Sequence, residues 1–553
     1  MLRKRIWRRV EPAKQNMATQ RIFLPLYLFA MFFIGLGYLA ILPAFEGFDE
    51  TAHYSSVRQI ADTGTIPIYG ASFLDEEIAH YQGPIPYTSG TPPFDHGLTY
   101  KKFFTQPNLV ENYLSSYRQA GFSVYRPSQE QNWQAQHPPL YYILLAPVEK
   151  ATERLSFVTQ IFILRLVSFL IALAGVAFGL LASRQSEKPI KTDPAIIGFM
   201  LYPLVLPMFF PEFTRIGNDC LCLFLVGATA FLLSKWLKDE NNKRLSVAIG
   251  VVLGLGLLTK AFFIPIIAAL GAFLLVRIFS DKHPGTIRSA HWKNLMLIFL
   301  PALLIGGGWY AYKFIAFGTL IGSADAITLA NQGGLVAGLK QNFSLYAVVR
   351  GLVVTFVSYS WAGTWSLTRL PPYLHAPLLV LAVWIFGAFA LQLKRRPLTD
   401  LAWLPVWLLG TFGCGFLYHT LIGVALSDNG QTPGWYLHIL MPWVAPVLGI
   451  GTLSLLQNFR TKPLFVGLLF YAVPFQIMAL WSQLALFTGC ATKGEDKSYT
   501  FSGHIFCLDQ IPILVDRLSV LGWPVLAAVG FGGGLICVML LMRVLRGKLV
   551  YLS

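Results

Sequence analysis

Four ionisable side chains gather in the stretch FEGFDETAHY (residues 45–54), directly after an apolar run. Glu46, Asp49 and Glu50 carry carboxylates, and a carboxylate within hydrogen-bond reach of a hydroxyl can take its proton during nucleophilic attack. His53 would share a helical face with Asp49 and Glu50, where it could orient a carboxylate or share a divalent metal ion with it. The alternatives are an acidic helix N-terminus favoured by the helix dipole, or a solvated face.

Two basic residues could bind a phosphate. Lys260 lies between two apolar segments in GLGLLTKAFF, and Arg215 lies at another turn in FFPEFTRIGNDCL. An isolated lysine in such a place is costly unless it finds water or an anion. Ammonium and guanidinium groups are natural partners of a phosphate, so both residues are candidate phosphate ligands. Snorkelling of these side chains to lipid headgroups is the alternative.

The same layer holds other side chains that could contact a substrate: Glu212, Asn218, Asp219, Arg350, Arg369, Gln431, Tyr436 and His438. Three tryptophans, Trp361, Trp365 and Trp435, could stack on a sugar or anchor the chain at the membrane interface, and the pattern slightly favours anchoring.

The elements that position these residues are predicted to be transmembrane helices. The 553-residue chain is 55% hydrophobic and 13% charged, with a mean hydropathy of +0.56, which argues against a single soluble core. We therefore expect an all-α polytopic membrane protein. Twelve segments are apolar and close to membrane-spanning length, at about 22–42, 160–183, 194–211, 216–236, 244–258, 261–279, 294–317, 371–393, 401–425, 435–457, 463–487 and 519–542.

Basic residues predict the orientation, because Lys and Arg collect near the cytoplasmic ends of membrane helices. The alternate loops and the two termini hold 26 of the 43 Lys and Arg residues, so both termini are predicted to be cytoplasmic. The net charge of +16 then has anionic lipid headgroups as its partner and gives no reason to expect nucleic acid. The basic start MLRKRIWRRV resembles a signal peptide, but the sequence favours an uncleaved first helix.

This topology divides the chain into eight parts. They are a basic cytoplasmic N-terminus (1–21), the first transmembrane helix (22–42), a large outer loop with interfacial helices (43–159), helices two to seven (160–317), an outer loop with an interfacial or re-entrant segment (318–370), helices eight to eleven (371–487), an outer loop (488–518), and the last helix with a cytoplasmic tail (519–553). The interfacial helices are expected from Glu50 to Asp62 and in HPPLYYILLAPVEKATERL, where Tyr141, Tyr142, Leu144 and Leu145 could rest on the bilayer surface.

The six cysteines fall into two classes. Cys220, Cys222, Cys414 and Cys537 lie in apolar segments, where thiols are ordinary packing groups. Cys490 and Cys507 bracket a polar outer loop, where an oxidising compartment permits a disulfide. The alternative is two unpaired thiols.

Several motifs resemble the GT-C superfamily of membrane glycosyltransferases. They are FDETAHYSSVRQIADTGTIP after the first helix, QHPPLYYILLAP near the end of the first outer loop, LTK at a later outer turn, and QTPGWYLHILMPWVAP near a late helix. The similarity is greatest to the bacterial branch with the aminoarabinose transferases of lipid A, and protein O-mannosyltransferases are more distant relatives. The layout covers most of the chain, whereas the specific motifs cover about forty residues.

The resemblance implies roles for individual residues. Asp49 would be the acidic residue that acts as base or activates the acceptor, with Glu50 as its neighbour. Lys260 and a nearby arginine, for which Arg215 is the candidate, would hold the phosphate of a polyprenyl-phosphate sugar. Because the first motif reads DET where the family more often has DEP, Glu46 is kept as an alternative base.

The sequence therefore predicts an integral glycosyltransferase of the bacterial inner membrane with a periplasmic active site. It would move a sugar from a polyprenyl-phosphate donor to an envelope glycolipid, polysaccharide or protein, with substrate contacts from His53, His137, Arg350, Arg369, Gln431, Tyr436 and His438. No cofactor is required, and a divalent ion at Asp49, Glu50 and His53 is the minority alternative. The rival classes are a transporter or flippase of a lipid-linked saccharide, which usually has mid-membrane charges and related halves, and a non-catalytic scaffold.

Overall fold

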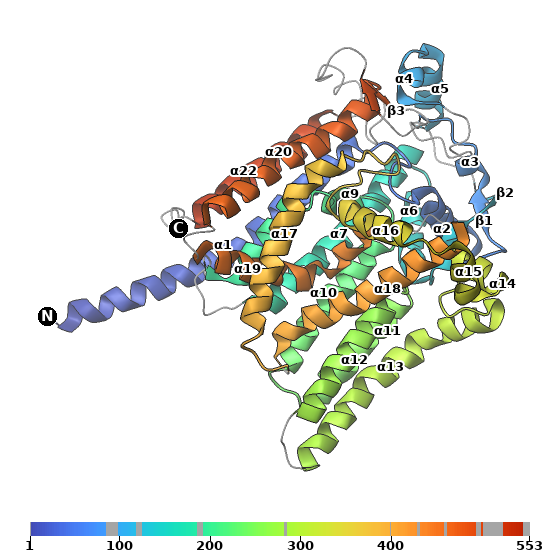
Figure 1. Ribbon diagram of the computed structural model, residues 1–553. Coiled ribbons are helices and arrows are strands. Elements are labelled where there is room, and N and C mark those ends of the chain that lie inside the picture. Colours follow the sequence, from blue (N-terminus) through green and yellow to red (C-terminus); the bar gives the residue numbers. More distant parts are fainter. Residues whose placement is uncertain are drawn as a thin grey trace.

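A computed structural model gives the fold of residues 2–84, 98–117, 124–184, 192–280, 285–398, 400–427, 432–457, 462–493, 499–501 and 524–545. Long helices run through the body of the molecule, and short helices and strands gather at one end of them (Figure 1). The expected all-α polytopic architecture is confirmed.

Nine helices of the described chain are long and apolar enough to cross a membrane. They are α1 (Leu2–Ile41), α7 (Phe157–Ser183), α10 (Asp219–Trp236), α13 (Gly285–Phe317), α17 (Pro372–Leu393), η3 with α18 (Leu401–Trp403, Leu404–Ser427), η4 with α19 (Gly434–Leu440, Met441–Gln457), α20 (Lys462–Phe487) and α22 (Pro524–Leu545). The other three of the twelve expected segments contain helices that are not among these nine, which are α8 (Pro194–Val205), α11 (Lys243–Leu257) and α12 (Phe263–Ser280).

Small residues let the long helices approach closely. A Cβ atom at Gly227 of α10 would lie 2.2 Å from the carbonyl oxygen of Gly175 in α7, and one at Gly530 of α22 would lie 2.3 Å from the amide nitrogen of Gly37 in α1. Such contacts allow backbone-to-backbone packing between membrane helices. The outer helices instead expose large apolar side chains, including Leu304 (74% exposed). A surface of this kind fits lipid tails.

The segment predicted to be the first outer loop folds into short elements on one side of the bundle, at the upper right of Figure 1. In chain order they are α2 (Glu50–Thr63), β1 (Phe73–Asp75), α3 (Glu76–Ala79), α4 (Tyr100–Phe104), α5 (Pro107–Tyr117), β2 (Pro127–Gln131), η1 (Trp133–Gln136) and α6 (Leu140–Thr152). Strands β1 and β2 pair antiparallel, with Phe73 opposite Gln131. The predicted helices at Glu50–Asp62 and after Pro139 correspond to α2 and α6.

One expectation about α6 is wrong. Tyr141, Tyr142 and Leu145 are buried, so they do not rest on the bilayer surface, and only Leu144 of that set is exposed. The two tyrosines instead contact residues of the core: the Tyr141 hydroxyl lies 2.7 Å from Ser168 Oγ of α7. The apolar composition of α6 thus reflects packing against the bundle.

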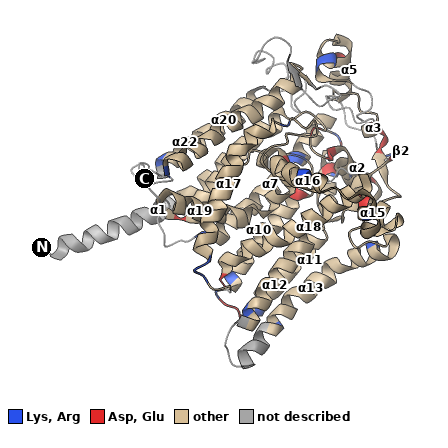
Figure 2. Ribbon diagram, viewed as in Figure 1, with Lys and Arg blue, Asp and Glu red and all other residues tan. Residues whose placement is uncertain are grey.

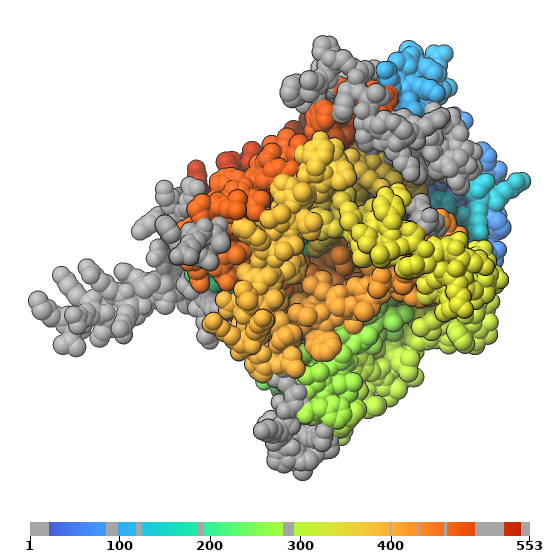
Figure 3. Space-filling model, in the orientation of Figure 1, coloured from blue at the N-terminus to red at the C-terminus, as the bar shows by residue number. Residues whose placement is uncertain are grey.

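The remaining short elements complete the same side. They are α9 (Phe209–Phe213), α14 (Ala324–Asn331), α15 (Gly334–Asn342), α16 (Leu345–Ser360), and the antiparallel pair β3 (Ala491–Lys493) and β4 (Tyr499–Phe501). Helices α15 and α16 are apolar enough to form one span together, but their axes differ by 108°. The sequence predicts an interfacial or re-entrant segment after residue 318, and a bend of this size is typical of a broken span or a re-entrant loop. In Figure 3 the surface is hollowed between α17 and α18.

The cysteines of the apolar segments are free thiols, on α10, α18 and α22. Cys490 is buried and disulfide-bonded. Cys507 lies outside the described residues, so its pairing with Cys490 stays a prediction.

Candidate active site

The predicted acidic motif forms a buried loop that joins α1 to α2. Phe45 and Asp49 adopt left-handed backbone conformations with φ of 64° and 57°, which non-glycine residues adopt rarely and mostly under structural constraint. Asp49 occupies the N-cap position of α2, but its side chain makes no capping hydrogen bond. A Cβ at Gly47 would lie 2.6 Å from Arg215 Cβ, so only glycine fits there.

Asp49 faces a cavity of about 250 Å³. Its Oδ1 accepts a 2.8 Å hydrogen bond from Trp133 Nε1, and the cavity wall includes Trp365, Trp435 and Tyr436. Burial raises the pKa of Asp49, although the Trp133 hydrogen bond and the charges of Arg215 and Lys260 oppose the shift. The Asp49 carboxylate is therefore a stronger base than an ordinary aspartate, and aromatic rings surround it. We call this space the Asp49 cavity.

Glu50 points away from that cavity into an ion pair. Arg165 of α7 donates from Nε to Glu50 Oε1 at 2.7 Å and from Nη2 to Oε2, and both side chains are 0% exposed. The same guanidinium donates to the carbonyl oxygens of Leu42 (2.7 Å) and Pro43 (2.8 Å), and the amide of Ile216 donates to Glu50 Oε1. Glu50 and Arg165 thus hold the loop in place.

Glu46 connects the two outer loops. Its carboxylate accepts hydrogen bonds from Tyr100 Oη (2.7 Å), Thr364 Oγ1 (2.7 Å) and Ser366 Oγ (2.6 Å), while its backbone oxygen accepts from the Trp365 amide (2.8 Å). Burial raises the pKa of Glu46, although these hydroxyl donors oppose the shift. The contacts place Trp365 in the wall of the Asp49 cavity.

A second ionic network lies beside the loop. Arg215 donates to the Phe48 carbonyl oxygen (2.8 Å), to Glu212 Oε1 (2.7 Å) and to Asp219 Oδ2 (3.0 Å). Lys260 Nζ lies 2.8 and 2.9 Å from the two carboxylate oxygens of Asp219. Burial raises the pKa of Glu212 to about 8, while the charge of Arg215 opposes the shift. Figure 2 shows charged residues near α2 and α16, within a largely uncharged body.

Lys260 lines a second cavity of about 230 Å³, which we call the Lys260 cavity. Its walls are mainly apolar and include Phe262, Trp309 and Phe416, and the Lys260 ammonium lies 4.4 Å from the ring centre of Tyr436. Thr432 and Tyr436 line both this cavity and the Asp49 cavity. The two spaces therefore meet at these residues.

Two predicted histidines lie next to each other near the Lys260 cavity. His53 Nδ1 is 2.9 Å from the Tyr142 hydroxyl, and the rings of His53 and His137 are nearly parallel with centres 6.5 Å apart. Burial lowers the pKa of His53 well below its ordinary value and that of His137 to about 3, and nearby cations contribute to both shifts. Both rings are therefore neutral, and His137 lines the Lys260 cavity.

The other predicted substrate residues are not all brought together. Arg369 and Tyr436 line the Asp49 cavity, whereas Arg350 is exposed on α16 and lines neither of the two cavities. His438 is fully buried behind the site, where its ring contacts the Tyr202 hydroxyl at 3.0 Å. Gln431 lies outside the described residues.

The residues suggested for a divalent ion do not converge on one point in the described structure. Glu50 faces Arg165 and His53 faces Tyr142, so neither side chain is directed at a common point with Asp49. In the part of the chain with described side chains, no group of three His, Cys, Asp or Glu residues could hold a metal ion.

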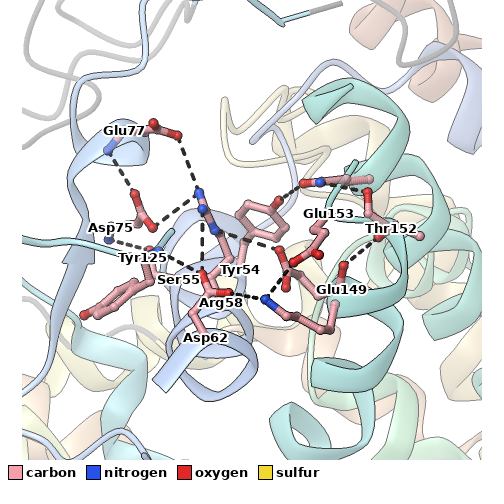
Figure 4. Close-up of polar contacts among 12 residues, drawn as sticks. Tyr54, Ser55, Arg58, Asp62, Asp75, Glu77, Tyr125, Glu149, Thr152 and Glu153 are labelled. Carbon is pink, nitrogen blue, oxygen red and sulfur yellow. Dashed lines mark hydrogen bonds and ion pairs between the residues drawn. The ribbon is translucent and has the colours of Figure 1, made fainter. Parts of the chain in front are cut away.

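A further ionic cluster fixes α2, which begins at the site. Arg58 of α2 lies 3.3 Å from Asp75, 3.6 Å from Glu77, 3.9 Å from Glu149 and 4.0 Å from Asp62, and is 2% exposed (Figure 4). Burial raises the pKa of Asp75 to about 6 and that of Glu149 to about 7, and the charge of Arg58 opposes both shifts. The cluster joins α2 to β1, α3 and α6.

From the sequence we did not identify Arg165, which contacts Glu50, or Trp133, which contacts Asp49. Arg165 had a clear signal, because it interrupts the apolar run QIFILRLVSFL, where a charge is costly and usually functional. Trp133 had none, since tryptophan is common near membrane interfaces.

Comparisons with known proteins support the conclusion that this chain is a membrane protein. A family model described as a predicted membrane protein (DUF2142) matches residues 32–426, which include Asp49 and Lys260. Curated proteins give no match. Two crystal structures are similar at low identity. ArnT from Cupriavidus metallidurans in the apo state has 14% identity and a TM-score of 0.42, over 96% of this chain and 78% of that one. The Archaeoglobus fulgidus oligosaccharyltransferase in the apo form has 10% identity and a TM-score of 0.38. The similarity covers 85% of this chain and 55% of that one. Because the family model covers most of the sequence, the chain belongs to the DUF2142 family of predicted membrane proteins.

Proposed function

We propose that this chain is an integral membrane glycosyltransferase that uses a polyprenyl-phosphate sugar as donor. The acceptor is a hydroxyl or phosphate of an envelope glycolipid, polysaccharide or protein, reached from the periplasmic face of the bacterial inner membrane. The observation that carries the proposal is the meeting of two unlike cavities at Thr432 and Tyr436. One contains a basic carboxylate among aromatic rings, and the other contains a cation among apolar side chains.

The Lys260 cavity suits the donor. Apolar side chains such as Phe262 and Phe416 fit an isoprenoid chain, and Lys260 fits its phosphate. The two contacts with Asp219 leave one of the three ammonium protons of Lys260 for that phosphate. A positive charge fixed at this place stabilises the negative charge that develops on the leaving phosphate.

The Asp49 cavity suits the acceptor. Trp365 and Trp435 line this cavity and offer aromatic contacts to a sugar ring, with Trp435 itself stacked on Phe48, and Asp49 offers a base with a raised pKa. In the proposed reaction the acceptor oxygen attacks the anomeric carbon and its proton passes to Asp49. The bond between that carbon and the phosphate oxygen breaks, and its electron pair stays on the phosphate. A single displacement of this kind inverts the anomeric centre and needs no covalent enzyme intermediate.

The proposal gives Glu50 and Arg215 positioning roles. Glu50 is held by Arg165 and backbone amides, and the described contacts of Arg215 are with Glu212, Asp219 and the Phe48 carbonyl. These contacts fix the loop that carries Asp49. Lys260 then remains as the cation that lines the donor cavity.

The test compares envelope material from cells with and without the gene by mass spectrometry of glycolipids and polymers. Loss of one sugar from a defined acceptor, restored by the wild-type gene but not by Asp49→Asn, is the expected result. If the lipid-linked sugar is instead moved across the membrane of proteoliposomes without being transferred, the transporter alternative replaces the proposal.

A further inference from the structure

Lys313, near the end of α13, is a buried lysine without a hydrogen-bond acceptor among the described residues. Its side chain is 0% exposed, and its Nζ makes no hydrogen bond. Three aromatic rings surround the ammonium, with centres at 4.8 Å (Phe317), 5.2 Å (Trp309) and 5.9 Å (Tyr69). Contacts of this kind compensate only part of the cost of burying a charge. In the described structure this ammonium therefore lacks an anion.

The aromatic cage of Lys313, formed by Tyr69, Trp309 and Phe317, stands beside the Lys260 cavity. Trp309 belongs to both, because its ring contacts the Lys313 ammonium and also lines the cavity. Burial lowers the pKa of His137, another lining residue, and the charges of Lys260 and Lys313 lower it further. Both cations thus act on the same part of the cavity.

The surroundings of Lys313 would let its ammonium move. Its stem passes under the turn after α13, where a Cβ at Gly322 would lie 2.6 Å from Lys313 Cδ. Gly318 and Gly322 both have positive φ, of 68° and 62°, and a Cβ at Gly318 would meet no atom within 4 Å, so the turn leaves open space beside Gly318. Because Cβ, Cγ and Cδ of Lys313 pack against Gly322, movement of the ammonium would come from rotation of the terminal bonds of the stem.

The cavity needs a further cation for a phosphoryl group. The described hydrogen bonds of Arg215 go to Glu212, Asp219 and a backbone oxygen, and Lys260 shares its charge with Asp219. A phosphoryl group bound beside Lys260 would therefore share that lysine with Asp219. Lys313 stands beside this cavity through Trp309, and its ammonium makes no hydrogen bond to a described residue.

We propose that Lys313 leaves its aromatic cage and binds a phosphoryl group in the Lys260 cavity. The identity of that group as the phosphate of a lipid donor rests on the proposed function. Free phosphate has the same chemistry, so the probes must separate the two sources. Donor binding would also release Tyr69, which belongs to the first outer loop, and would thereby link the donor cavity to that loop.

The experiment measures ligand binding to the full chain in nanodiscs of zwitterionic lipid. The probes are polyprenyl phosphate, the matching polyprenol and inorganic phosphate. Lys313→Met keeps the length of the side chain and removes its charge. We expect it to raise the melting temperature without ligand, to weaken polyprenyl phosphate binding by about ten- to a hundredfold, and to leave polyprenol binding unchanged. Lys293→Met, at an exposed position of the same helix, is the control and should change none of these values.

The outcomes separate the two proposals. Unchanged polyprenyl phosphate affinity in Lys313→Met, together with lost affinity in Lys260→Met, overturns the role of Lys313 and leaves the proposed function standing. If wild-type protein binds polyprenyl phosphate no better than polyprenol, the donor assignment fails and this inference fails with it. Competition by inorganic phosphate at the affinity of the lipid would support a phosphoryl site at Lys313 and identify its ligand as free phosphate.

A measurement on the wild-type protein covers the case in which Lys313→Met does not fold. Amine modification of Lys313 is followed by quantitative mass spectrometry with each probe. We expect polyprenyl phosphate, but not polyprenol, to change the modification rate of Lys313 and to leave that of Lys293 unchanged. Equal rates at Lys313 with and without polyprenyl phosphate would contradict the movement.

Discussion

The ion pair between Glu50 and Arg165 can be tested by Glu50→Gln, which keeps the shape of the side chain and removes its charge. Both partners are 0% exposed, and Arg165 also holds the carbonyl oxygens of Leu42 and Pro43. The glutamine amide would turn one acceptor of the guanidinium into a donor, so the substitution leaves a buried cation without its anion.

The expected magnitude follows from that burial. Removing one member of a buried ion pair costs about 3–5 kcal/mol, because the other charge stays desolvated. Net stabilities of folded domains are only about 5–15 kcal/mol, so the loss is a large share of the total. Glu50→Gln should therefore lower the thermal stability and the folded yield, while the molecules that do fold should still bind donor.

The assay is a double-mutant cycle on thermal unfolding in detergent. It uses the wild type, Glu50→Gln, Arg165→Met and the double variant. The double variant should be less destabilised than the sum of the single changes, because it removes both charges together. Glu111→Gln, an exposed position of the same outer loop, is the control for the substitution itself and should leave stability unchanged.

Two results would refute this reasoning. The first is an additive cycle, which would mean that the two side chains do not stabilise each other. The second is a Glu50→Gln protein that is as stable as the wild type but inactive in sugar transfer. That second result would return Glu50 to the catalytic pair predicted from the sequence.

Three further predictions concern chemistry, pH and covalent structure. Asp49→Asn should keep the fold, because asparagine also tolerates the left-handed backbone, but should lower transfer from a synthetic polyprenyl-phosphate sugar by about 10²–10⁴; near-normal turnover would remove Asp49 as the base. In the Arg58 cluster, the folded state raises the pKa of Asp75 from 3.8 to about 6 and that of Glu149 from 4.5 to about 7. Their stabilising contribution is therefore fully present below the unfolded values near 4 and is lost as pH rises through 6 and 7. The melting temperature of the wild type should therefore fall as the pH rises from about 4 to about 7. Glu149→Gln should reduce this fall between about pH 6 and 7, and an equal fall in both proteins would contradict the pKa assigned to Glu149. Non-reducing peptide mapping should find Cys490 joined to Cys507, and free thiols at both positions would refute the pairing.

Most of the helices could be predicted from the sequence, because each helix is marked by the residues within its own segment. Apolar runs mark the helices wherever the chain must satisfy its backbone hydrogen bonds in lipid. Helix α2 ends at Thr63, one residue beyond the predicted end at Asp62, with Gly64 in a left-handed C-cap at φ 67°. Helix lengths were less predictable. The segment expected at 194–211 divides into α8 and α9, because Leu206 leaves the helical conformation between them.

The sequence predicted which segments form the candidate site, but it did not predict the ion-pair partners of the charged side chains. Topology alone placed the motif of Asp49 and the turn of Lys260 at the same membrane face. The partner of Glu50 lies 115 residues away on α7, and such a contact depends on how helices pack. Arg165 and Lys313 each interrupt an apolar run, so charge within a predicted span was the signal that could have found both.

The contacts of Glu46 also have a consequence for the order of synthesis. The Glu46 carboxylate accepts hydrogen bonds from Thr364 and Ser366, which lie 318 and 320 residues later in the sequence. At about 5–20 residues per second, roughly 15–65 s pass between synthesis of Glu46 and of these partners. The pair of Glu50 and Arg165 is complete much earlier, after 115 residues. We infer that the Asp49 cavity closes only when most of the chain has been made, so a nascent chain contains Asp49 long before the cavity wall around it is complete.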